Sequence, residues 1–446
     1  MGSSITFTSE VYTARREVLK KKLGSGKILL MGNDEASMNY VDNTYHYRQD
    51  STFLYYIGIS QAGLNAIIDI DKNETILFGD DPTTDTIIWI GKTPKISELG
   101  EQVGIDLAEP NSQLMNFVSD GTHYLPPYRD KHTLKLRAWM GTNALKPSIP
   151  LIKAIIDQRS IKSSEEIEQL DKASSISRAM HKAVEENVKA GMTEYELVSY
   201  ASKVAWENNC QFAYPAIMTK NGQTLHNHYY GNLLQDGDMV LYDGGAALPS
   251  GYCGDLTRTF PVSGTFSSLQ AKVHKLVQDM YNGAVAMSKA GVKYYDVHLH
   301  TAQIMTQGLT DLGWMKGNVK ESVAARAFTV FFPHGLGHML GLDVHDMENF
   351  GEEYVGYSED FKKSTEFGLR SLRLGKELQA GYVITIEPGI YVIPELIDKR
   401  MREGAFKEFI NYEFLQSHLD FGGIRLEDDY LVQENGVRIL GADNIS

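Results

Sequence analysis

The chain has 446 residues, of which 42% are hydrophobic and 22% charged, so it can bury a large core and is expected to form two or three domains. Its 57 acidic and 43 basic residues give a net charge of −14, which disfavours nucleic acid and anionic membrane surfaces as partners. Two cysteines cannot form a disulfide framework, and no segment reads as a signal peptide or a membrane span, so a cytoplasmic location is expected.

The first part of the chain alternates short apolar runs with turns. Four of these runs lie at 27–32, 66–71, 75–82 and 86–92. We interpret them as strands separated by helical stretches, which predicts a mixed α/β domain.

The character of the sequence changes near residues 155–163. Ser163 and Glu166 have the spacing of a capping box, which predicts the start of a helix with regularly spaced apolar residues. We therefore expect an N-terminal domain over 1–157 and a second domain over 158–446.

The second domain contains a short internal sequence repeat. Lys189-Ala190-Gly191 and Lys289-Ala290-Gly291 each end a predicted helix, and each precedes a further helical run. Glycine often ends a helix, so chance recurrence is one explanation, but an internal duplication of a helix–turn–helix–hairpin unit is the better one. Two such units facing one another form a pseudo-symmetric domain in which a site can lie between the halves.

The segment 351–380 is long, polar and weakly periodic. It is expected to be an extended surface loop or an insertion, and long ordered loops are often functional.

The first candidate side chains for chemistry are two aspartates. Asp243 and Asp255 lie on two apolar runs joined by a Pro-Ser-Gly turn, which predicts a hairpin. Strand alternation places Asp255 and Thr257 on one face, so a short reversal brings both aspartates to the same concave face. Two solvent-facing aspartates near a turn are the alternative.

Three histidines follow within a short apolar segment. The run FFPHGLGHMLGLDVHD contains His334, His338 and His345. Histidines four apart can share a helix face, and each histidine alone is more typical of a buried structural role. Three of them in so short a segment favour a site.

Two further acids lie in apolar runs. Glu387 ends the Val/Ile run of GYVITIEPGIY, and Glu427 lies in GGIRLEDDYLV. A lone buried carboxylate is costly, so each demands a partner cation. Arg425 lies two residues before Glu427 and on the same strand face, so a simple Arg425–Glu427 ion pair is the alternative to a metal site there.

Four carboxylates and one histidine form an oxygen-rich ligand set. Such a set suits Mn²⁺, Mg²⁺ or a pair of Zn²⁺ or Co²⁺ ions better than a thiolate site does. Four acids around one divalent ion leave excess negative charge, whereas two ions about 3.5–4 Å apart, bridged by carboxylates and a water, balance it. The residues therefore indicate a dinuclear hydrolase.

At these residues the sequence resembles the pita-bread metallopeptidases, which include methionine aminopeptidase, Xaa-Pro aminopeptidase (aminopeptidase P) and Xaa-Pro dipeptidase (prolidase). The resemblance rests on TLHNH, LYDGGA with GDLTRTFP, FFPHGLGHMLGLDVHD, ITIEPGIY and GGIRLEDD, in that order. In the N-terminal part, YRQDSTFLYYIGI and LFGDDPTTDTIIWIGK resemble the domain that accompanies the proline-specific members. The implied fold is an N-terminal mixed α/β domain followed by a pseudo-two-fold pita-bread catalytic domain.

The resemblance also implies roles for individual residues. Two divalent ions, with Mn²⁺ expected and Co²⁺ or Zn²⁺ as alternatives, are implied at a metal site of Asp243, Asp255, His338, Glu387 and Glu427. The resemblance places His226, His334 and His345 around the substrate, and Arg425 is a further substrate-binding candidate. Glu387 is expected to move a proton between water and the leaving nitrogen, and His334 and His345 are expected to stabilise the tetrahedral intermediate.

Two departures from the family pattern bear on these expectations. Asp243 and Asp255 are separated by one residue more than is usual, which predicts an extra residue in the turn around Leu248–Ser250. His226 is followed by Asn-His rather than by an aromatic residue, so His228 is an alternative for its role.

The implied activity is hydrolysis of the bond between an N-terminal residue and a following proline. The segment FGLRSLRLGKELQAGYVITIEPG resembles prolidase, in which the second arginine of the run binds the carboxylate of a dipeptide; here that residue is Arg373. We therefore favour a Xaa-Pro dipeptidase over a Xaa-Pro aminopeptidase, with a solvated loop arginine as the alternative for Arg373. Family members commonly form dimers or tetramers, so a homodimer or homotetramer is expected.

A different class of function shares the fold. Non-catalytic binding modules, including histone-chaperone domains, and also creatinase have the fold without the metal ligands. All five ligand positions are filled in this chain, which favours the enzyme.

Overall fold

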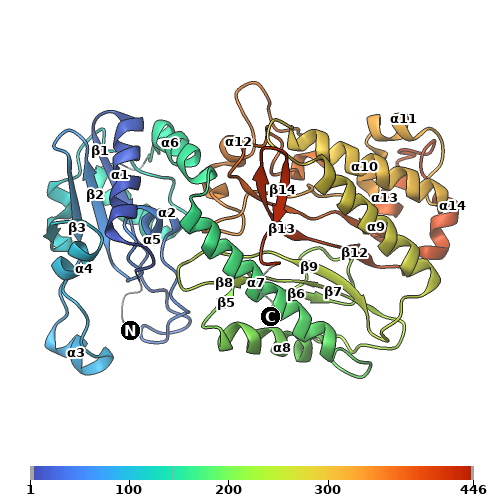
Figure 1. The fold of residues 1–446 in the computed structure, drawn as a ribbon, viewed down its shortest axis with the longest axis horizontal. Coiled ribbons are helices and arrows are strands. Elements are labelled where there is room, and N and C mark those ends of the chain that lie inside the picture. Colours follow the sequence, from blue (N-terminus) through green and yellow to red (C-terminus); the bar gives the residue numbers. More distant parts are fainter. Residues whose placement is uncertain (1–4, 143, 443–446) are drawn as a thin grey trace. The chain divides into compact units, whose positions relative to one another are not determined.

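The computed structural model describes residues 5–142 and 144–442. The backbone divides into two compact units (Figure 1). The first contains the chain up to Arg159 with the short segments Pro249–Gly251 and Asn349–Tyr354, and the second contains Ser160–Leu248, Tyr252–Glu348 and the chain from Val355.

The first unit is built on a four-stranded sheet in the order β1-β2-β3-β4, in which only the β3–β4 pair is parallel. The strands are β1 (Lys27–Met31), β2 (Asn65–Asp69), β3 (Glu74–Phe78) and β4 (Leu107–Glu109). The other elements are α1 (Ser9–Leu23), α2 (Ser51–Tyr56), α3 (Thr84–Ile90), α4 (Ile96–Gln102), η1 (Asn111–Asn116), α5 (Asp130–Met140) and α6 (Ile149–Ser160). Alternate side chains of the first three strands pack with Leu136 of α5 into a buried core.

One of the four predicted strands is wrong. The runs at 27–32, 66–71 and 75–82 overlap β1, β2 and β3, but the run at 86–92 lies largely within helix α3. The Thr83 side chain accepts a hydrogen bond from the Thr86 backbone N–H at 3.1 Å and so caps this helix. Within the described ranges no strand pairs with the run, so its β-branched residues lack the partner that makes a strand stable, and Trp89 remains 85% exposed.

The second unit contains two pairs of long helices. Within each pair the helices pack together, α7 (Ser164–Asn187) with α8 (Glu194–Glu207) and α9 (Ser268–Met287) with α10 (Tyr294–Asp311) (Figure 1). Ser163 and Glu166 form the predicted capping box at the start of α7. Gly191 and Gly291 lie in the two connections with φ of +87° and +82°, a conformation that glycine adopts without strain.

Each half of this unit also has a three-stranded antiparallel sheet. The first is β6-β7-β9, with β6 (Ile217–Thr219), β7 (Met239–Asp243) and β9 (Thr257–Pro261), and the second is β10-β13-β14, with β10 (Val383–Ile386), β13 (Asp428–Gln433) and β14 (Gly436–Ile439). Two short ladders join β5 (Gln211–Phe212) to β8 (Ala246–Ala247) and β11 (Gly389–Tyr391) to β12 (Gly423–Arg425). A helix pair followed by a three-stranded sheet thus occurs twice, in agreement with the duplication predicted from the Lys-Ala-Gly repeat.

The remaining elements are short: α11 (Val319–Ala324), η2 (Ala327–Val330), η3 (Glu348–Phe350), α12 (Glu352–Val355), η4 (Leu369–Ser371), α13 (Pro394–Arg402), α14 (Tyr412–Leu415) and η5 (Gln416–His418). They cover the predicted loop 351–380 only in part, and that segment is not simply a surface loop. Tyr357, Leu372 and Leu374 are buried in it, and the N–H of Gly375 donates to Gly356 O at 2.9 Å. Its apolar residues are spaced irregularly, so they pack one by one and leave no helical or strand period in the sequence.

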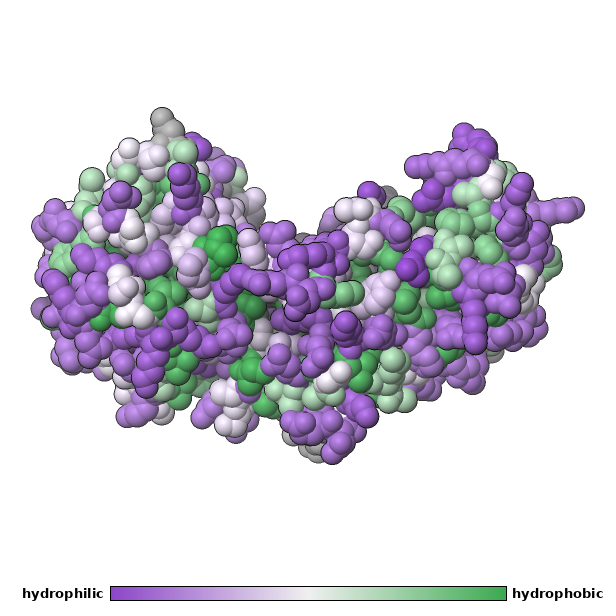
Figure 2. All heavy atoms as spheres, turned by 90° about the horizontal axis from the view of Figure 1, so that it is seen from above, coloured by the Kyte–Doolittle hydropathy of each residue, from purple (hydrophilic) through white to green (hydrophobic). Residues whose placement is uncertain are grey.

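The surface is largely hydrophilic on the face shown in Figure 2, with hydrophobic residues scattered between polar ones. Such scattering is normal for a protein surface in water. Within the described part of the chain, none of the helices combines the length and the apolar character that a membrane crossing needs.

Candidate metal centre

The hairpin of β7 and β9 brings the two aspartates together. Asp243 pairs with Thr257 across the antiparallel ladder, and Asp255 lies two residues before Thr257, so all three share one face. The Tyr214 hydroxyl lies 2.5 Å from Asp243 Oδ1 and also contacts Asp255 Oδ1. The two carboxylates therefore share a single hydrogen-bond donor in a buried position.

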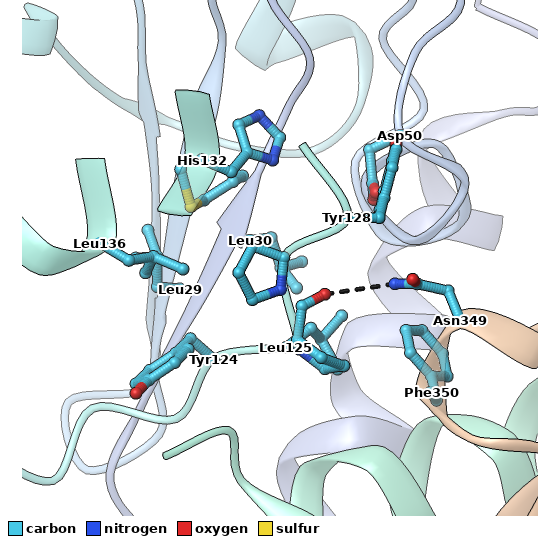
Figure 3. Close-up of a pocket in the computed structure, with 13 residues that line it drawn as sticks. Leu29, Leu30, Asp50, Tyr124, Leu125, Tyr128, His132, Leu136, Asn349 and Phe350 are labelled. Atoms are coloured by element: carbon cyan, nitrogen blue, oxygen red, sulfur yellow. Dashed lines mark hydrogen bonds between the residues drawn. The ribbon is translucent and has the colours of Figure 1, made fainter. Parts of the chain in front are cut away.

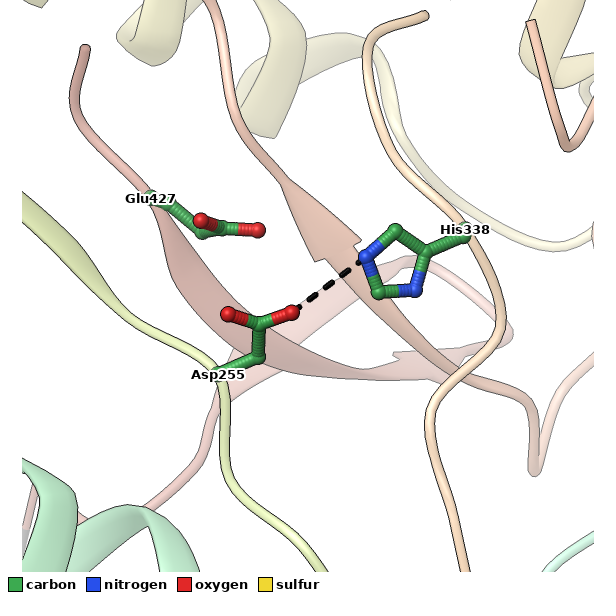
Figure 4. Close-up of side chains that lie close together, drawn as sticks. All are labelled: Asp255, His338 and Glu427. Carbon is green, nitrogen blue, oxygen red and sulfur yellow. Dashed lines mark ion pairs between the residues drawn. The ribbon is translucent and has the colours of Figure 1, made fainter. Parts of the chain in front are cut away.

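Three side chains from separate segments form a tight group. One ligand atom each of Asp255, His338 and Glu427 lies within 4.8 Å of the other two, and all three residues are buried (Figure 4). His338 Nε2 lies 3.3 Å from Asp255 Oδ2, the ion pair drawn in Figure 4. The Thr257 hydroxyl donates to Glu427 Oε2 at 2.7 Å, which fixes that carboxylate beside β9.

Glu387 lies at the edge of this group, directly after β10. Its Oε1 is 4.0 Å from His338 Nε2, and its Oε2 is 3.6 Å from His334 Nδ1. The Glu387 N–H donates to Leu336 O at 2.8 Å and holds the backbone in place. The structure thus brings the five residues expected as ligands into one region, three of them in the tight group and Asp243 and Glu387 on either side.

Keeping these buried carboxylates ionised without a cation between them costs free energy. Burial raises the pKa of Glu427 well above its usual value, and the charges of Asp255, Glu387 and Asp243 raise it further. Burial also raises the pKa of Glu387 to about 7, opposed by the charges of His338 and Arg425. Burial lowers the pKa of His338, but its hydrogen bond to Asp255 and the charge of that residue outweigh burial and raise the value to about 9.

This group fits divalent cations. Buried carboxylates that repel one another gain most from a positive ion placed between them. Carboxylate oxygens with one imidazole nitrogen are the donors that Mn²⁺, Co²⁺ and Zn²⁺ accept in proteins, and no thiolate contributes. Asp255, His338 and Glu427 therefore have the donor atoms and the spacing that a metal ion needs.

Arg425 has a different partner from the one considered at the sequence level. Its Nη2 lies 2.5 Å from Asp243 Oδ2 rather than forming an ion pair with Glu427. Its Nη1 donates to the Tyr391 hydroxyl at 2.8 Å, and that hydroxyl is 2.8 Å from His334 Nε2. Arg425 Nε also donates to the Thr257 hydroxyl at 3.2 Å, and the same hydroxyl donates to Glu427 Oε2, so the two side chains meet on one face without forming an ion pair.

The histidines do not lie on a helix. The chain from 331 to 347 has no helix, so the helical face considered for His334 and His338 is wrong. The glycines in HGLGHMLG allow close backbone contacts instead, since a Cβ at Gly337 would lie 2.1 Å from Thr385 O. The ring of His345 packs on the ring of His338 with centroids 4.3 Å apart.

The pKa values of the flanking histidines are depressed. Burial lowers the pKa of His334 to about 3, and the charge of Arg425 lowers it too. Burial lowers the pKa of His345 to about 2, helped by the charges of His338 and Arg373. Both imidazoles are therefore neutral at pH 7, the form in which one ring nitrogen donates and the other accepts.

Glu348 is a residue that the sequence analysis missed. Its Oε2 lies 3.4 Å from His345 Nδ1 and 2.5 Å from Arg373 Nη1, so it joins the two side chains. The sequence does show Glu348 as an acidic residue three positions after His345. Because it lies outside the family motifs, and an acid near a histidine is common, only the fold singles it out.

His226 is one of the histidines expected around the substrate. It is exposed, yet its surroundings remove enough water to lower its pKa, and the charge of Arg425 lowers it further. The charges of Arg373 and His228 lower the pKa of His226 as well. A role for His228 beside His226 stays a prediction.

A separate small pocket belongs to the first unit (Figure 3). Its lining is mainly apolar and aromatic, with Leu29, Tyr124 and Phe350 among the side chains, and Asn349 Nδ2 donates to Pro126 O at 3.2 Å across it. None of the residues expected at the metal site lines this pocket.

Comparison with known proteins gives consistent matches along the chain. Residues 168–434 match metallopeptidase family M24, and residues 12–123 match the aminopeptidase P N-terminal domain. Human Xaa-Pro dipeptidase is 31% identical over 93% of this chain and 85% of its own length. A probable Xaa-Pro aminopeptidase of Fusarium vanettenii is 30% identical over 94% of this chain and 90% of its own.

A solved structure shows the same fold. Proline aminopeptidase P II from Yersinia pestis superposes with a TM-score of 0.80 at 28% identity, covering 99% of this chain and 97% of that one. The fold is therefore the predicted one, an N-terminal mixed α/β domain followed by a pita-bread catalytic domain. By these matches and its group of Asp255, His338 and Glu427, the chain belongs to metallopeptidase family M24.

Proposed function

We propose that this protein is a dinuclear-metal exopeptidase that hydrolyses the bond between an N-terminal residue and a following proline, with Xaa-Pro dipeptides as its substrates. The family membership and the names of the relatives support the reaction class. Proline has a tertiary nitrogen and no N–H, so peptidases that need that donor handle this bond poorly.

Two divalent ions are proposed at the group, Mn²⁺ first and Co²⁺ or Zn²⁺ as alternatives. Their proposed ligands are Asp243, Asp255, His338, Glu387 and Glu427. When bound, such ions polarise the scissile carbonyl and make water a nucleophile at neutral pH.

The side chains around the group are proposed to move protons and orient the substrate. Glu387 takes a proton from the attacking water and returns it to the proline nitrogen, which leaves more readily once protonated. His334 and His345 donate hydrogen bonds to the tetrahedral intermediate. Both His334 nitrogens already have partners, Gly335 O at 2.7 Å and the Tyr391 hydroxyl at 2.8 Å, so the substrate has to displace one of them.

The preference for dipeptides rests on the position of Arg373. A chain of contacts leads from His338 through the His345 ring and the Glu348 carboxylate to the Arg373 guanidinium. Its ion pair with Glu348 and its place two side chains from His338 support a substrate-binding role for Arg373 over a purely solvated loop arginine. A guanidinium here can bind the carboxylate that ends a dipeptide, in a bidentate way that Lys cannot match.

A Xaa-Pro aminopeptidase acting on longer peptides is the second candidate. Glu348 partly neutralises Arg373, which weakens its attraction for a substrate carboxylate, and the Fusarium relative carries the aminopeptidase name. A homodimer or homotetramer and a cytoplasmic location complete the proposal.

The test compares a Xaa-Pro dipeptide with the matching Xaa-Pro-Yaa tripeptide after loading with Mn²⁺. We expect wild type to prefer the dipeptide, and Arg373→Ala to lower kcat/KM on the dipeptide by about ten- to a hundredfold, because a charged hydrogen bond contributes roughly 1.5–3 kcal/mol. Efficiency on the tripeptide should change little. The exposed Arg370 lies in the same run and provides the matched control Arg370→Ala.

Equal losses on both substrates would assign Arg373 a structural role in its loop. A wild-type preference for the tripeptide would favour the aminopeptidase. Absence of hydrolysis of either peptide would contradict the proposed function itself.

A further inference from the structure

A buried ion pair lies behind the histidine segment. Lys162 Nζ is 2.8 Å from Asp346 Oδ2, and each side chain is only 1% exposed. Lys162 comes just before the capping box of α7, and Asp346 directly follows His345. Lys and Asp are almost never so deeply buried unless they are paired, as these two are.

Stability alone does not explain this pair. Removing two charges from water costs about as much as their attraction returns, so a well-packed apolar pair of similar size is often equally stable. Losing one partner is far more costly, because the other charge stays buried. Fixing one particular conformation is the role that such buried pairs have in some proteins.

The conformation in question is that of the loop between the two histidines. The Asp346 N–H donates to Met339 O at 2.9 Å, so the residues that follow His338 and His345 are tied together. Asp346 Oδ1 accepts from the Asp343 N–H at 3.3 Å. The Asp346 carboxylate thus lies inside the loop and closes it.

A glycine makes room for this carboxylate. A Cβ at Gly341 would lie 2.4 Å from Asp346 Oδ2, closer than any side chain tolerates. The loop is therefore built around the carboxylate, and larger side chains at position 341 are excluded while Asp346 stays in place.

Lys162 in turn is fixed from outside the loop. The backbone N–H of Lys162 donates to Gly381 O at 2.9 Å, shortly before the strand β10. The capping box of Ser163 and Glu166 sets the start of α7 immediately after it. The ammonium group therefore anchors the loop to a rigid helix end and to the second sheet.

We propose that Lys162 and Asp346 are positioning residues that hold the His345 ring against His338, an inference that rests on the proposed function. Neither side chain touches substrate. Their effect reaches the reaction through the 4.3 Å ring contact of His338 and His345 and through the orientation of His345 toward Glu348.

The test uses Lys162→Met and the double variant Lys162→Met with Asp346→Leu, with kinetics on a Xaa-Pro dipeptide and urea unfolding of the metal-free protein. Lys162→Met should lose both stability and at least tenfold in kcat, with KM within about threefold of wild type. The double variant should regain most of the stability, because no unpaired charge remains buried, but not the kcat. Lys135→Met removes a lysine 2.7 Å from Asp34 Oδ2 in the first unit and should leave kcat unchanged.

If the double variant regained kcat together with stability, the pair would contribute only to stability. That result would overturn the inference. A folded Lys162→Met variant with wild-type kcat would do the same. If Lys162→Met fails to fold, the double variant alone decides. Lack of hydrolysis by wild type would instead contradict the proposed function, so the two failures are distinct.

Discussion

At the scale of single residues, the metal centre is a balance between burial and charge. Asp243 is paired with Arg425, while Glu427 accepts from the Thr257 hydroxyl and lies in the tight group with Asp255 and His338, where burial and the neighbouring carboxylates raise its pKa. A charge placed among such groups interacts with them more strongly than it would at the surface, because little water screens the interaction. Substitutions here should change chemistry more than they change the fold.

Glu387→Gln tests the proton-transfer role. The amide keeps the shape of the side chain but cannot take a proton from water, so kcat should fall by about a hundred- to ten-thousandfold while KM changes little. Steady-state kinetics with a parallel measurement of bound metal separates lost proton transfer from lost metal. Weakened substrate binding with near-normal turnover would remove Glu387 from the acid–base role.

His298 makes a prediction about acid stability that is independent of the metal. It is fully buried in α10 between Phe328 and Phe332, and neither ring nitrogen has a hydrogen-bond partner in the described ranges. Burial lowers its pKa to about 3, with the charge of Arg326 acting in the same direction. Its usual pKa is near 6.5, so the unfolded chain takes up a proton that the folded chain refuses as the pH falls between these values.

The contribution of neutral His298 to the free energy of unfolding is therefore complete above about pH 6.5. It is lost progressively as the pH falls to about 3. Between pH 7 and pH 5 the metal-free wild type should lose about 2 kcal/mol through this histidine, and His298→Leu should not. Urea unfolding of both proteins at the two pH values measures the difference. An equal loss in both proteins would show that His298 is protonated in the folded state.

At the scale of elements, the site depends on how closely the hairpin approaches α7. Gly254 precedes Asp255, and a Cβ there would lie 2.6 Å from Ser177 Oγ and 3.0 Å from the α7 backbone. Gly254→Ala should push the hairpin away from the helix, displace Asp255 and lower metal affinity at least tenfold. Gly436→Ala is the matched control, since its Cβ meets nothing within 4 Å.

Metal titration of both glycine variants, followed by unfolding of each, measures these effects. Wild-type metal affinity in Gly254→Ala would mean that the helix shifts to accommodate the methyl group. It would also mean that the close approach is not needed for the site.

Local sequence signals predicted some elements well and failed at others for identifiable reasons. The capping box at Ser163 and the alternation that puts Asp243 and Asp255 on one face are local, and the fold preserves both. The run at 86–92 has strand composition but no strand to pair with, which only the whole sheet decides. The links from Glu348 to Arg373 and from Lys162 to Asp346 join distant segments, so no periodicity reveals them.

At the scale of the whole molecule, the two units should respond differently to metal. Every proposed ligand belongs to the second unit, so ions that bind only the folded state should stabilise that unit, by about 3 kcal/mol at a free concentration a hundred times Kd. A chelator should abolish hydrolysis and lower the unfolding temperature of the second unit, and leave that of the first unchanged. Scanning calorimetry with and without chelator measures both.

Asp255→Ala is the companion variant. It should behave like the chelated protein and gain no stability from added Mn²⁺. Hydrolysis that survives chelation, with metal analysis showing no bound ion, would contradict the metal proposal.

The duplicated architecture also bears on how the protein is made. Asp243 and Asp255 belong to the sheet of the first half, whereas Glu387 and Glu427 come with the sheet of the second, and a bridge between Thr257 and Glu427 links them. A ribosome releases the chain from its N-terminal end, so folding of the first unit and the first helix pair can precede the second half. The ion-binding group, however, cannot close before Glu427 has emerged. With the proposed ligands, a nascent chain completes its metal centre only near the end of its synthesis, and a chain that ends before Glu427 lacks part of it.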